Sequence, residues 1–429
     1  MTSHLPVVRL GDYCEVDSGF AFKSERFSQN PDDINLVKGS NLGHRTIDWD
    51  EGPKWPKAEF EKLKFYELIT DDVVLAMDRP IVGGNLKFAW MTKSDPQALL
   101  VQRVARLRAK ERLDQIYLRY VIADSAFNLY IDTITTGSNI PHISGPDIRD
   151  YKFPLPSINT QNKVAAILSA YDDLIENNLK RIKLLEEMAQ ITYEEWFVRL
   201  KFPGHETASM DSETGLPVGW EKMTCFDLMD VFSGGTPKTD VAEYWDGNIK
   251  FFTPKDAANC VYTLETEKTI TELGLKKCNS KLYPKNTIFI TARGTVGKLN
   301  LAREAMAMNQ SCYALIAKNE LSQLFLFCAL NNAIGAFKGA ANGGVFDAIV
   351  VDTFRYISII KSDEELIGQF DSAIKPIFEQ VDNLIKQNQL LKEARDILLP
   401  RLMTGMIDVE QLVLPNTLQV EGATCDEIS

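Results

Sequence analysis

The chain has 429 residues, of which 45% are hydrophobic and 25% charged, a composition typical of soluble globular proteins and a length that suits two to four domains. It contains no uninterrupted apolar run of membrane-spanning length, and its seven dispersed cysteines form no disulfide or metal framework, which fits a reducing cytoplasm. The net charge of −12 argues against a nucleic-acid binder, but most of it falls in residues 158–216 and 361–429, so the rest of the chain is nearly neutral.

The chain contains a diverged tandem duplication. Residues 71–89 and 98–110 of the first half match residues 285–302 and 306–318 of the second. Each block predicts apolar strands joined by a glycine-containing turn. The matched side chains are Arg79 with Arg293, Gly83 with Gly297, and Gln102 with Gln310.

In both halves a short helical pattern and a glycine-containing loop follow these strands. The helical patterns cover residues 116–131 and 325–337, and the loops cover residues 135–144 and 339–349. Features that recur in the same order predict two similar domains.

Each half then ends in a long helix. The first is expected to begin near residues 157–161 and to stop before Pro203. The second is expected to begin at Ser362, where a glutamate three residues later completes a capping-box pattern. Proline removes an amide donor, so we expect a kink or break near Pro376 and the end of the helix around Pro400.

Both helices carry an apolar stripe whose steps alternate between four and three residues, as in coiled coils. The stripes are Val164, Leu168, Tyr171, Ile175, Asn178, Ile182, Leu185, Ala189, Thr192 and Trp196, and Phe370, Ile374, Ile377, Val381, Leu384, Asn388, Leu391, Arg395, Leu398 and Leu402. Equivalent stripes in a repeat favour helices that pair with each other.

An antiparallel pair would span roughly 60 Å, at about 1.5 Å per residue, and could hold two different DNA readers roughly one helical turn or more apart. A symmetric pairing would bring Asn178 opposite Asn388, where a polar pair fixes the register at some cost in stability. The expected fold class is α+β: two similar mixed α/β domains joined by two long antiparallel, coiled-coil-like helices, with a pseudo-two-fold internal repeat.

Ordered motifs along most of the chain resemble the specificity (S) subunit of type I restriction-modification enzymes. Residues 16–27, and residues 215–222 with 233–256, look like the openings of its target-recognition domains. Residues 153–168 and 194–204 are similar to the two ends of its first conserved helical region, and residues 398–409 to the end of its second. The resemblance implies six segments: target-recognition domain 1 (1–157), helical region 1 (158–204), a linker (205–216), target-recognition domain 2 (217–360), helical region 2 (361–405) and a C-terminal tail (406–429).

The resemblance also implies a cytoplasmic complex on double-stranded DNA. Two methyltransferase subunits would use S-adenosylmethionine to methylate adenine, and restriction subunits, where present, would add ATP- and magnesium-dependent translocation and cleavage. The S subunit would choose the site for them, with no catalytic residue, metal or cofactor of its own and no membrane contact.

Candidate DNA-binding residues are basic and hydroxyl side chains on predicted loops, because phosphates supply most of the affinity and base edges supply specificity. They are Lys23, Ser24, Arg26, Lys38 and Arg79 in the first half and Thr236, Lys238, Thr239, Lys255, Lys276, Lys277 and Arg293 in the second. Arg79 and Arg293 are favoured because they recur at matched positions beside glycine turns. The run Arg103, Arg106 and Arg108 is better explained as a solvated strand face.

Two other classes of function stay open at this stage. A scaffold that binds only proteins would explain the helices. A disguised nuclease would use residues 146–152, in which Asp147 lies too close to the Asp-x-Lys of Asp150 and Lys152 to be persuasive. Four dispersed histidines lack metal-ligand spacing, and residues 293–298 lack the full phosphate-loop pattern.

Overall fold

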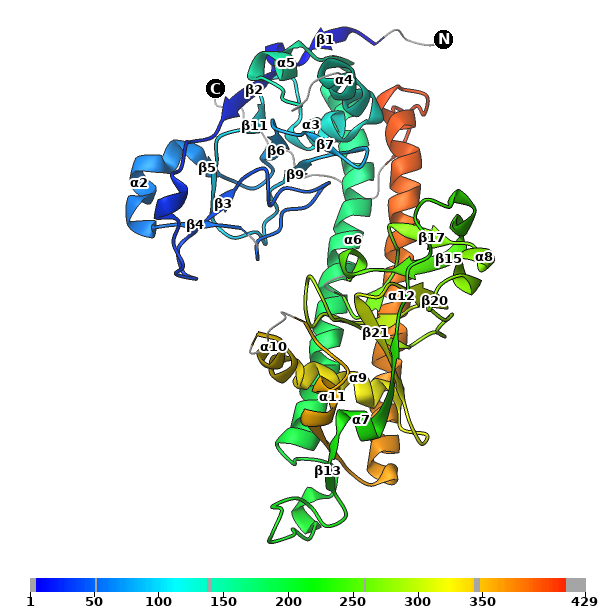
Figure 1. Ribbon diagram of the computed structural model, residues 1–429. Coiled ribbons are helices and arrows are strands. Elements are labelled where there is room, and N and C mark those ends of the chain that lie inside the picture. Colours follow the sequence, from blue (N-terminus) through cyan, green and yellow to red (C-terminus); the bar gives the residue numbers. More distant parts are fainter. Residues whose placement is uncertain (1–4, 51, 137–140, 258–259, 343–347, 414–429) are drawn as a thin grey trace. The chain divides into compact units, whose positions relative to one another are not determined.

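The computed structural model describes residues 5–50, 52–136, 141–257, 260–342 and 348–413. The chain forms two compact units, one made of residues 1–175 and 390–429 and the other of residues 176–389. Each unit combines short strands and helices with a stretch of both long helices, α6 (Ile158–Tyr193) and α12 (Glu364–Met403) (Figure 1). The six-segment division therefore stays a prediction, since the compact units divide within the long helices.

The first unit contains two four-stranded sheets, of order β4-β3-β10-β5 and β2-β11-β6-β9, and a ribbon in which β1 pairs with β12. Within the sheets β10 runs parallel to β3, and the other neighbours are antiparallel. The strands are β1 (Val7–Arg9), β2 (Cys14–Ser18), β3 (Ile34–Val37), β4 (Lys54–Trp55), β5 (Glu67–Leu68), β6 (Val73–Ala76), β7 (Ile81–Val82), β8 (Asn85–Leu86), β9 (Phe88–Trp90), β10 (Ala98–Leu100), β11 (Val104–Ala109) and β12 (Lys152–Pro154). The helices, besides its parts of α6 and α12, are α1 (Leu10–Tyr13), α2 (Phe60–Leu63), α3 (Gln115–Ala123), α4 (Ser125–Thr135) and α5 (Gly145–Asp150).

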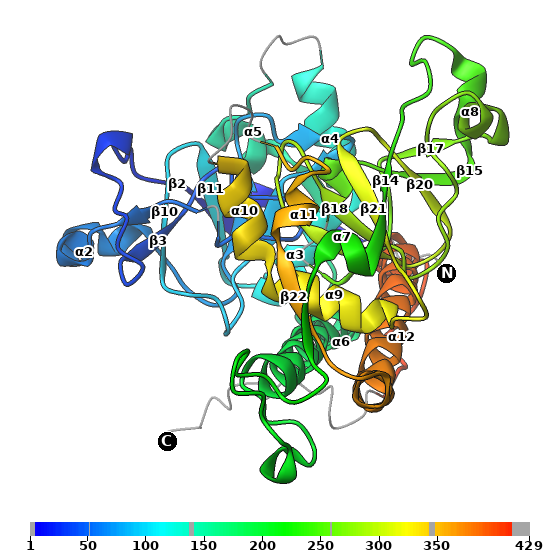
Figure 2. The ribbon, with the colours of Figure 1, turned by 60° about the horizontal axis from the view of Figure 1, so that its bottom comes forward.

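The second unit contains a five-stranded sheet of order β14-β21-β18-β19-β16, a three-stranded sheet of order β17-β15-β20, and the ribbon β13-β22. Helix α9 lies against β19 and β21 and next to α10 (Figure 2). The strands are β13 (Glu221–Thr224), β14 (Met229–Ser233), β15 (Trp245–Phe252), β16 (Tyr262–Thr263), β17 (Lys268–Ile270), β18 (Ile288–Thr291), β19 (Leu299–Ala302), β20 (Met306–Met308), β21 (Cys312–Ala317) and β22 (Ser358–Lys361). The helices, besides its parts of α6 and α12, are α7 (Cys225–Leu228), α8 (Glu272–Lys276), α9 (Gln323–Asn332), α10 (Ile334–Asn342) and α11 (Thr353–Tyr356).

The two units repeat one framework, which confirms the predicted duplication. The order β2-β11-β6-β9 recurs as β14-β21-β18-β19, and the parallel pair β3-β10 recurs as β15-β20. An equivalent glutamine in each unit makes the same two hydrogen bonds. Gln115 accepts from the Ala109 amide and donates to the Leu107 carbonyl. Gln323 accepts from the Ala317 amide and donates to the Leu315 carbonyl. The middle of each predicted glycine loop lies outside the described residues.

The matching of Arg79 with Arg293 is wrong by one residue. Met77 donates to the Arg103 carbonyl at 2.8 Å, and Ala292 donates to the Ser311 carbonyl at the same distance. Met77 therefore corresponds to Ala292, so Asp78 corresponds to Arg293 and Arg79 to Gly294. Backbone conformation agrees, since Arg79 (φ 45°) and Gly294 (φ 79°) are both left-handed. The match of Gln102 with Gln310 holds.

Both long helices bury the predicted stripes. Every stripe position of α6 and α12 is buried or half-buried. In the second unit Tyr193 of α6 packs against Phe370 of α12, whereas Asn178, further back along α6, contacts Asn388, further along α12. This order of contacts makes the pair antiparallel, as predicted. In the first unit Leu168 and Leu399 belong to one buried cluster.

Three details of the long helices differ from the predictions: the cap of α12, its continuation through Pro376, and the turn that follows α6. The cap of α12 is Asp363, whose Oδ1 accepts from the Leu366 amide at 2.9 Å, and not Ser362. The helix continues through Pro376, because this proline is exposed and the flanking Ile374 and Phe378 are buried, so the carbonyl that loses its donor can face water. The end of α12 at Met403 lies close to the predicted Pro400. Helix α6 leads into a π-helical turn, Glu194–Val198.

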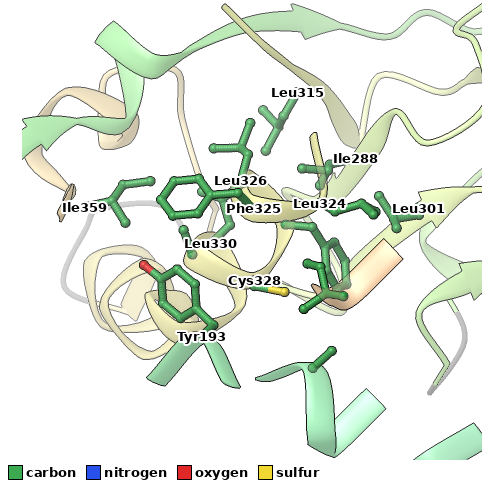
Figure 3. Close-up of a cluster of buried hydrophobic side chains, with 14 of the residues drawn as sticks. Tyr193, Ile288, Leu301, Leu315, Leu324, Phe325, Leu326, Cys328, Leu330 and Ile359 are labelled. Carbon is green, nitrogen blue, oxygen red and sulfur yellow. The ribbon is translucent and has the colours of Figure 1, made fainter. Parts of the chain in front are cut away.

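A large aromatic and aliphatic core holds the second unit together. Tyr193 from α6 and Phe325, Cys328 and Leu330 from α9 lie within it (Figure 3). Phe197 joins it through ring contacts of 5.0 Å with Phe325 and 5.1 Å with Phe370. The aromatic side chains at the end of the first long helix therefore pack in the core.

Candidate nucleic-acid interface

The first-unit candidates are mostly exposed, but two of them already have partners. Arg26 forms an ion pair with Glu59 and lies 4.8 Å above the Trp55 ring. Lys38 is half-buried and lies 5.8 Å from the Phe27 ring. Lys23, Ser24 and Arg79 are exposed, and so is Arg26. The first three are better placed to meet a ligand, because Glu59 already holds the guanidinium of Arg26.

Arg79 lies beside a lysine that the sequence did not single out. Burial and the charge of Arg79 lower the pKa of Lys87, and the Lys87 ammonium donates to the carbonyl of Gly39, the residue after Lys38. The connection after β6 thus brings Arg79 and Lys87 together, and Lys87 bonds the turn after β3. The sequence did not reveal this basic pair, because the two residues lie eight positions apart in a connection whose course the sequence does not fix.

In the second unit all seven candidates are exposed: Thr236, Lys238, Thr239, Lys255, Lys276, Lys277 and Arg293. Lys255 forms a 3.4 Å ion pair with Glu267. Lys276 and Lys277 lie at the end of α8, on a different element from Arg293, which lies in the turn after β18. The hydroxyl of Thr236 donates to the side chain of Gln310.

The turn after β15 is built like the turn after β3. The Lys38 amide donates to the Asn41 side chain at 2.9 Å, and the Thr253 amide donates to the Asp256 side chain at 2.7 Å. In the second unit this turn approaches Gly294, since a Cβ there would lie 4.0 Å from the Pro254 Cβ. Both units therefore present a capped turn next to the turn that follows β6 or β18.

The glycines of the recognition turns serve two purposes. Gly83 (57°) and Gly297 (80°) adopt positive φ, whereas Gly234 and Gly235 do not. Instead, Gly234 is required by close approach, because a Cβ there would lie 2.1 Å from the Asn309 carbonyl oxygen. Gly235 is similarly crowded, with a Cβ meeting Asn279 at 2.6 Å.

The arginine run of β11 is not a solvated face. Arg106 is buried, 3% exposed, and pairs with Asp17 at 2.8 Å. Arg108 binds Asp72 through two bonds of 2.5 and 2.7 Å. Arg103 is exposed and pairs at 2.6 Å with Asp78, whose other oxygen lies 2.6 Å from His142 Nδ1. Only Arg103 of the three is open to a ligand.

The asparagine pair of the helix seam is in contact. Asn178 Nδ2 donates to Asn388 Oδ1 at 3.0 Å, and both residues are 5% exposed. Apolar neighbours, Ile182 and Leu384 among them, are also buried. That this pair sets the register stays a prediction.

No metal site was found in the described residues, where no three histidine, cysteine or acidic side chains are grouped to hold an ion. Asp147, the candidate nuclease residue, instead accepts from the amide and hydroxyl of Ser144 in the capping box of α5. No described helix is long and apolar enough to cross a membrane.

The family model described as "Type I restriction modification DNA specificity domain" matches residues 4–187 and 217–394. The chain belongs to the type I restriction-modification specificity family. The two matched ranges each cover one copy of the repeated framework, so the duplicated α+β fold is that of this family.

Similar proteins agree with this assignment. The MjaIX specificity subunit of Methanocaldococcus jannaschii is 29% identical over 69% of this chain and 70% of its own. The HindI specificity subunit of Haemophilus influenzae is 24% identical over 62% of this chain and 71% of its own. The solved type I S subunit of M. genitalium shares the fold with a TM-score of 0.52 at 14% identity, over 94% of this chain and 97% of that one.

Proposed function

We propose that this specificity subunit reads a bipartite, asymmetric DNA target, with one half-site for each recognition domain. The observation that carries this proposal is that one framework occurs twice with different residues at the same turn. Asp78 and Arg103 in the first unit stand where the second unit has Arg293 and Ser311. Two readers with unlike side chains at one position select unlike bases.

The charge of the chain is compatible with this role. Near-neutral recognition segments can carry local basic groups such as Arg79 and Lys87, whose contacts with phosphates supply affinity. We assign the acidic segments, which include the long helices, to protein contacts. In this proposal the helices dock two methyltransferase subunits in the cytoplasm, and restriction subunits join where the system includes them.

The chemistry would belong to those partners. The methyltransferase subunits would bind S-adenosylmethionine, and the restriction subunits ATP and magnesium, while this chain would contribute no catalytic group. The length of the long helices is suited to spacing the two recognition domains. Helix α12 has 40 residues, or roughly 60 Å at about 1.5 Å per residue. The spacer between the half-sites would be unread.

Mapping methylated adenines across the genome, with and without the gene for this chain, tests the proposal. We expect one split, asymmetric motif to lose its methylation when the gene is deleted. Unchanged methylation would contradict the proposal. In a second measurement, DNA affinity of the assembled complex should fall steeply as salt rises; a scaffold that binds only proteins would show no such dependence.

A further inference from the structure

The main-chain hydrogen bonds align the two units residue by residue. In this alignment the positions of the recognition turns fall into two groups, those with the same side chain in both units and those with different side chains. At three exposed positions the side chain is the same in both units. These shared positions are Ser18 and Ser233, Lys23 and Lys238, and Gln102 and Gln310. At three neighbouring positions the side chain differs between the two units. These private positions are Asp78 and Arg293, Arg103 and Ser311, and His142 and Ala348.

The shared positions lie on two segments that touch in the first unit. The Gln102 amide donates to the Phe20 carbonyl at 2.8 Å. A Cβ on Gly19 would lie 2.4 Å from the Val101 backbone, so Ser18 and Gln102 flank a point of close approach. Lys23 stands four residues after that glycine.

The second unit repeats this contact. Gly234 approaches the Asn309 carbonyl as closely, and Gln310 is the next residue. Lys238 again stands four residues after the glycine. The Thr236 hydroxyl donates to Gln310 Oε1, which orients the amide so that its Nε2 can donate to an outside acceptor.

The private positions adjoin the shared ones. Arg103 and Ser311 directly follow the shared glutamines. In the first unit Asp78 holds both Arg103 and His142 at 2.6 Å. The shared Ser18 contacts Met77, the residue before Asp78, with its Oγ 3.7 Å from the sulfur. Each unit thus presents constant and variable groups side by side.

We propose that the shared positions bind the phosphate backbone and that the private positions read the bases of each half-site. This inference rests on the proposed function. Two half-sites with different sequences have the same sugar-phosphate backbone, so on the DNA the backbone presents the same partner to identical side chains in both units. Base edges differ between half-sites and need different readers.

The residue chemistry agrees with the division. Lysine ammonium, serine hydroxyl and glutamine amide groups all donate to phosphate oxygens. The private set holds arginine and aspartate, which pair with guanine and with the amino group of cytosine respectively, and serine, which can contact several bases. The private set of the first unit, Asp78, Arg103 and His142, therefore has a different donor and acceptor pattern from Arg293, Ser311 and Ala348.

The test uses the chain assembled with its methyltransferase subunits and the duplex motif found by methylation mapping. Affinities are measured for that duplex and for duplexes with single base-pair changes in each half-site. The variants are Gln102→Ala, Lys23→Ala and Arg103→Ser, with Gln310→Ala and Lys238→Ala for the second unit. Lys152→Ala on β12 and Lys222→Ala on β13 are matched controls, since both lysines are exposed on the ribbons.

Gln102→Ala should weaken binding to all duplexes alike, by about tenfold, as expected for a lost hydrogen bond to a charged group. Lys23→Ala should do the same and reduce the slope of log affinity against log salt by about one. Arg103→Ser should change the preference at one half-site only. The controls should match the wild type.

The division is overturned if Gln102→Ala or Lys23→Ala alters base preference at one half-site. It is also overturned if these variants leave DNA affinity unchanged and weaken assembly with the methyltransferase subunits, which would make the shared positions a protein contact. If the wild-type complex shows no split preference at all, the proposed function fails as well, and that result is visible before any variant is made.

Discussion

The two units place different chemistry at one point of the same strand framework. In the first unit Arg106 of β11 lies opposite Asp17 of β2, and the buried guanidinium also donates to the carbonyls of Phe65 and Glu67. In the second unit Ala314 of β21 lies opposite Phe232 of β14, and both pack in a hydrophobic cluster. The strand pairing is thus independent of whether this point is filled by an ion pair or by apolar groups.

The surroundings of an acidic side chain on the long helices differ in a similar way. In the first unit Asp172 of α6, whose side chain is 12% exposed, binds Arg395 of α12 and accepts from Tyr120 at 2.7 Å, and both partners are buried. In the second unit Asp382 of α12 binds Lys285 and Arg303 with its side chain 24% exposed. Loss of a partner should therefore cost more in the first unit, where water has less access to replace it.

The largest expected effect comes from Arg395→Met. The change keeps the volume but leaves the half-buried Asp172 carboxylate without its ion-pair partner, at a cost of about 3 kcal/mol to the first unit. Hydrogen exchange of α3 and of residues 158–175 should accelerate accordingly. The matched variant Arg303→Met should change exchange in the second unit much less, and equal effects would contradict the comparison.

Arg106→Ala should destabilise the first unit by about 2 kcal/mol, because it leaves Asp17 half-buried without its partner. The double variant Asp17→Phe with Arg106→Ala copies the second unit. It should recover most of the lost stability, as judged by the urea midpoint of the first unit's signal. A double variant no more stable than Arg106→Ala would show that the two points are not equivalent.

Removing the seam pair is expected to have a smaller effect. Asn178→Leu alone should cost about 1 kcal/mol, since it removes the hydrogen bond that Asn178 Nδ2 donates to the buried Asn388 Oδ1. The double leucine variant should be at least as stable as wild type but should form additional oligomers or registers, detectable by light scattering and cysteine cross-linking. A double variant with one register and one mass would remove the register role from this pair.

The smallest effect is a pH dependence of the second unit. Burial favours the neutral form of Asp382, but hydrogen bonds from Lys285 and Arg303 outweigh it and lower the pKa. A carboxyl with a lowered pKa in the fold stabilises above its unfolded pKa, and this stabilisation is lost as the pH falls through the folded value. Stability should therefore decline below about pH 4, and Asp382→Asn should reduce the decline.

Part of this comparison was predictable from sequence. The apolar stripes of the two long helices were predictable. A four-and-three spacing of apolar residues survives divergence and places one face of each helix in the contact between them. The order of strands, helices and loops recurred clearly enough to predict two similar domains. Asn178 and Asn388 could be placed opposite each other because helix geometry converts spacing directly into position.

The turns of the two units were harder to match from sequence, for a physical reason. Strands β6 and β18 are buried on both faces, so their sequences lack the alternation that fixes register. The glycine turns differ in length, and matching them shifted Arg79 onto Arg293. Side-chain partners such as Asp17 for Arg106, far apart in sequence, emerge only from strand pairing.

The most direct test of the central claim, that the two domains read separate half-sites, is methylation mapping with Arg293→Ala. This arginine lies in the second unit at the position of Asp78. We predict relaxed base preference at one half-site, with the other half-site and the spacer length unchanged. Relaxation of both half-sites, or an altered spacer, would contradict the account.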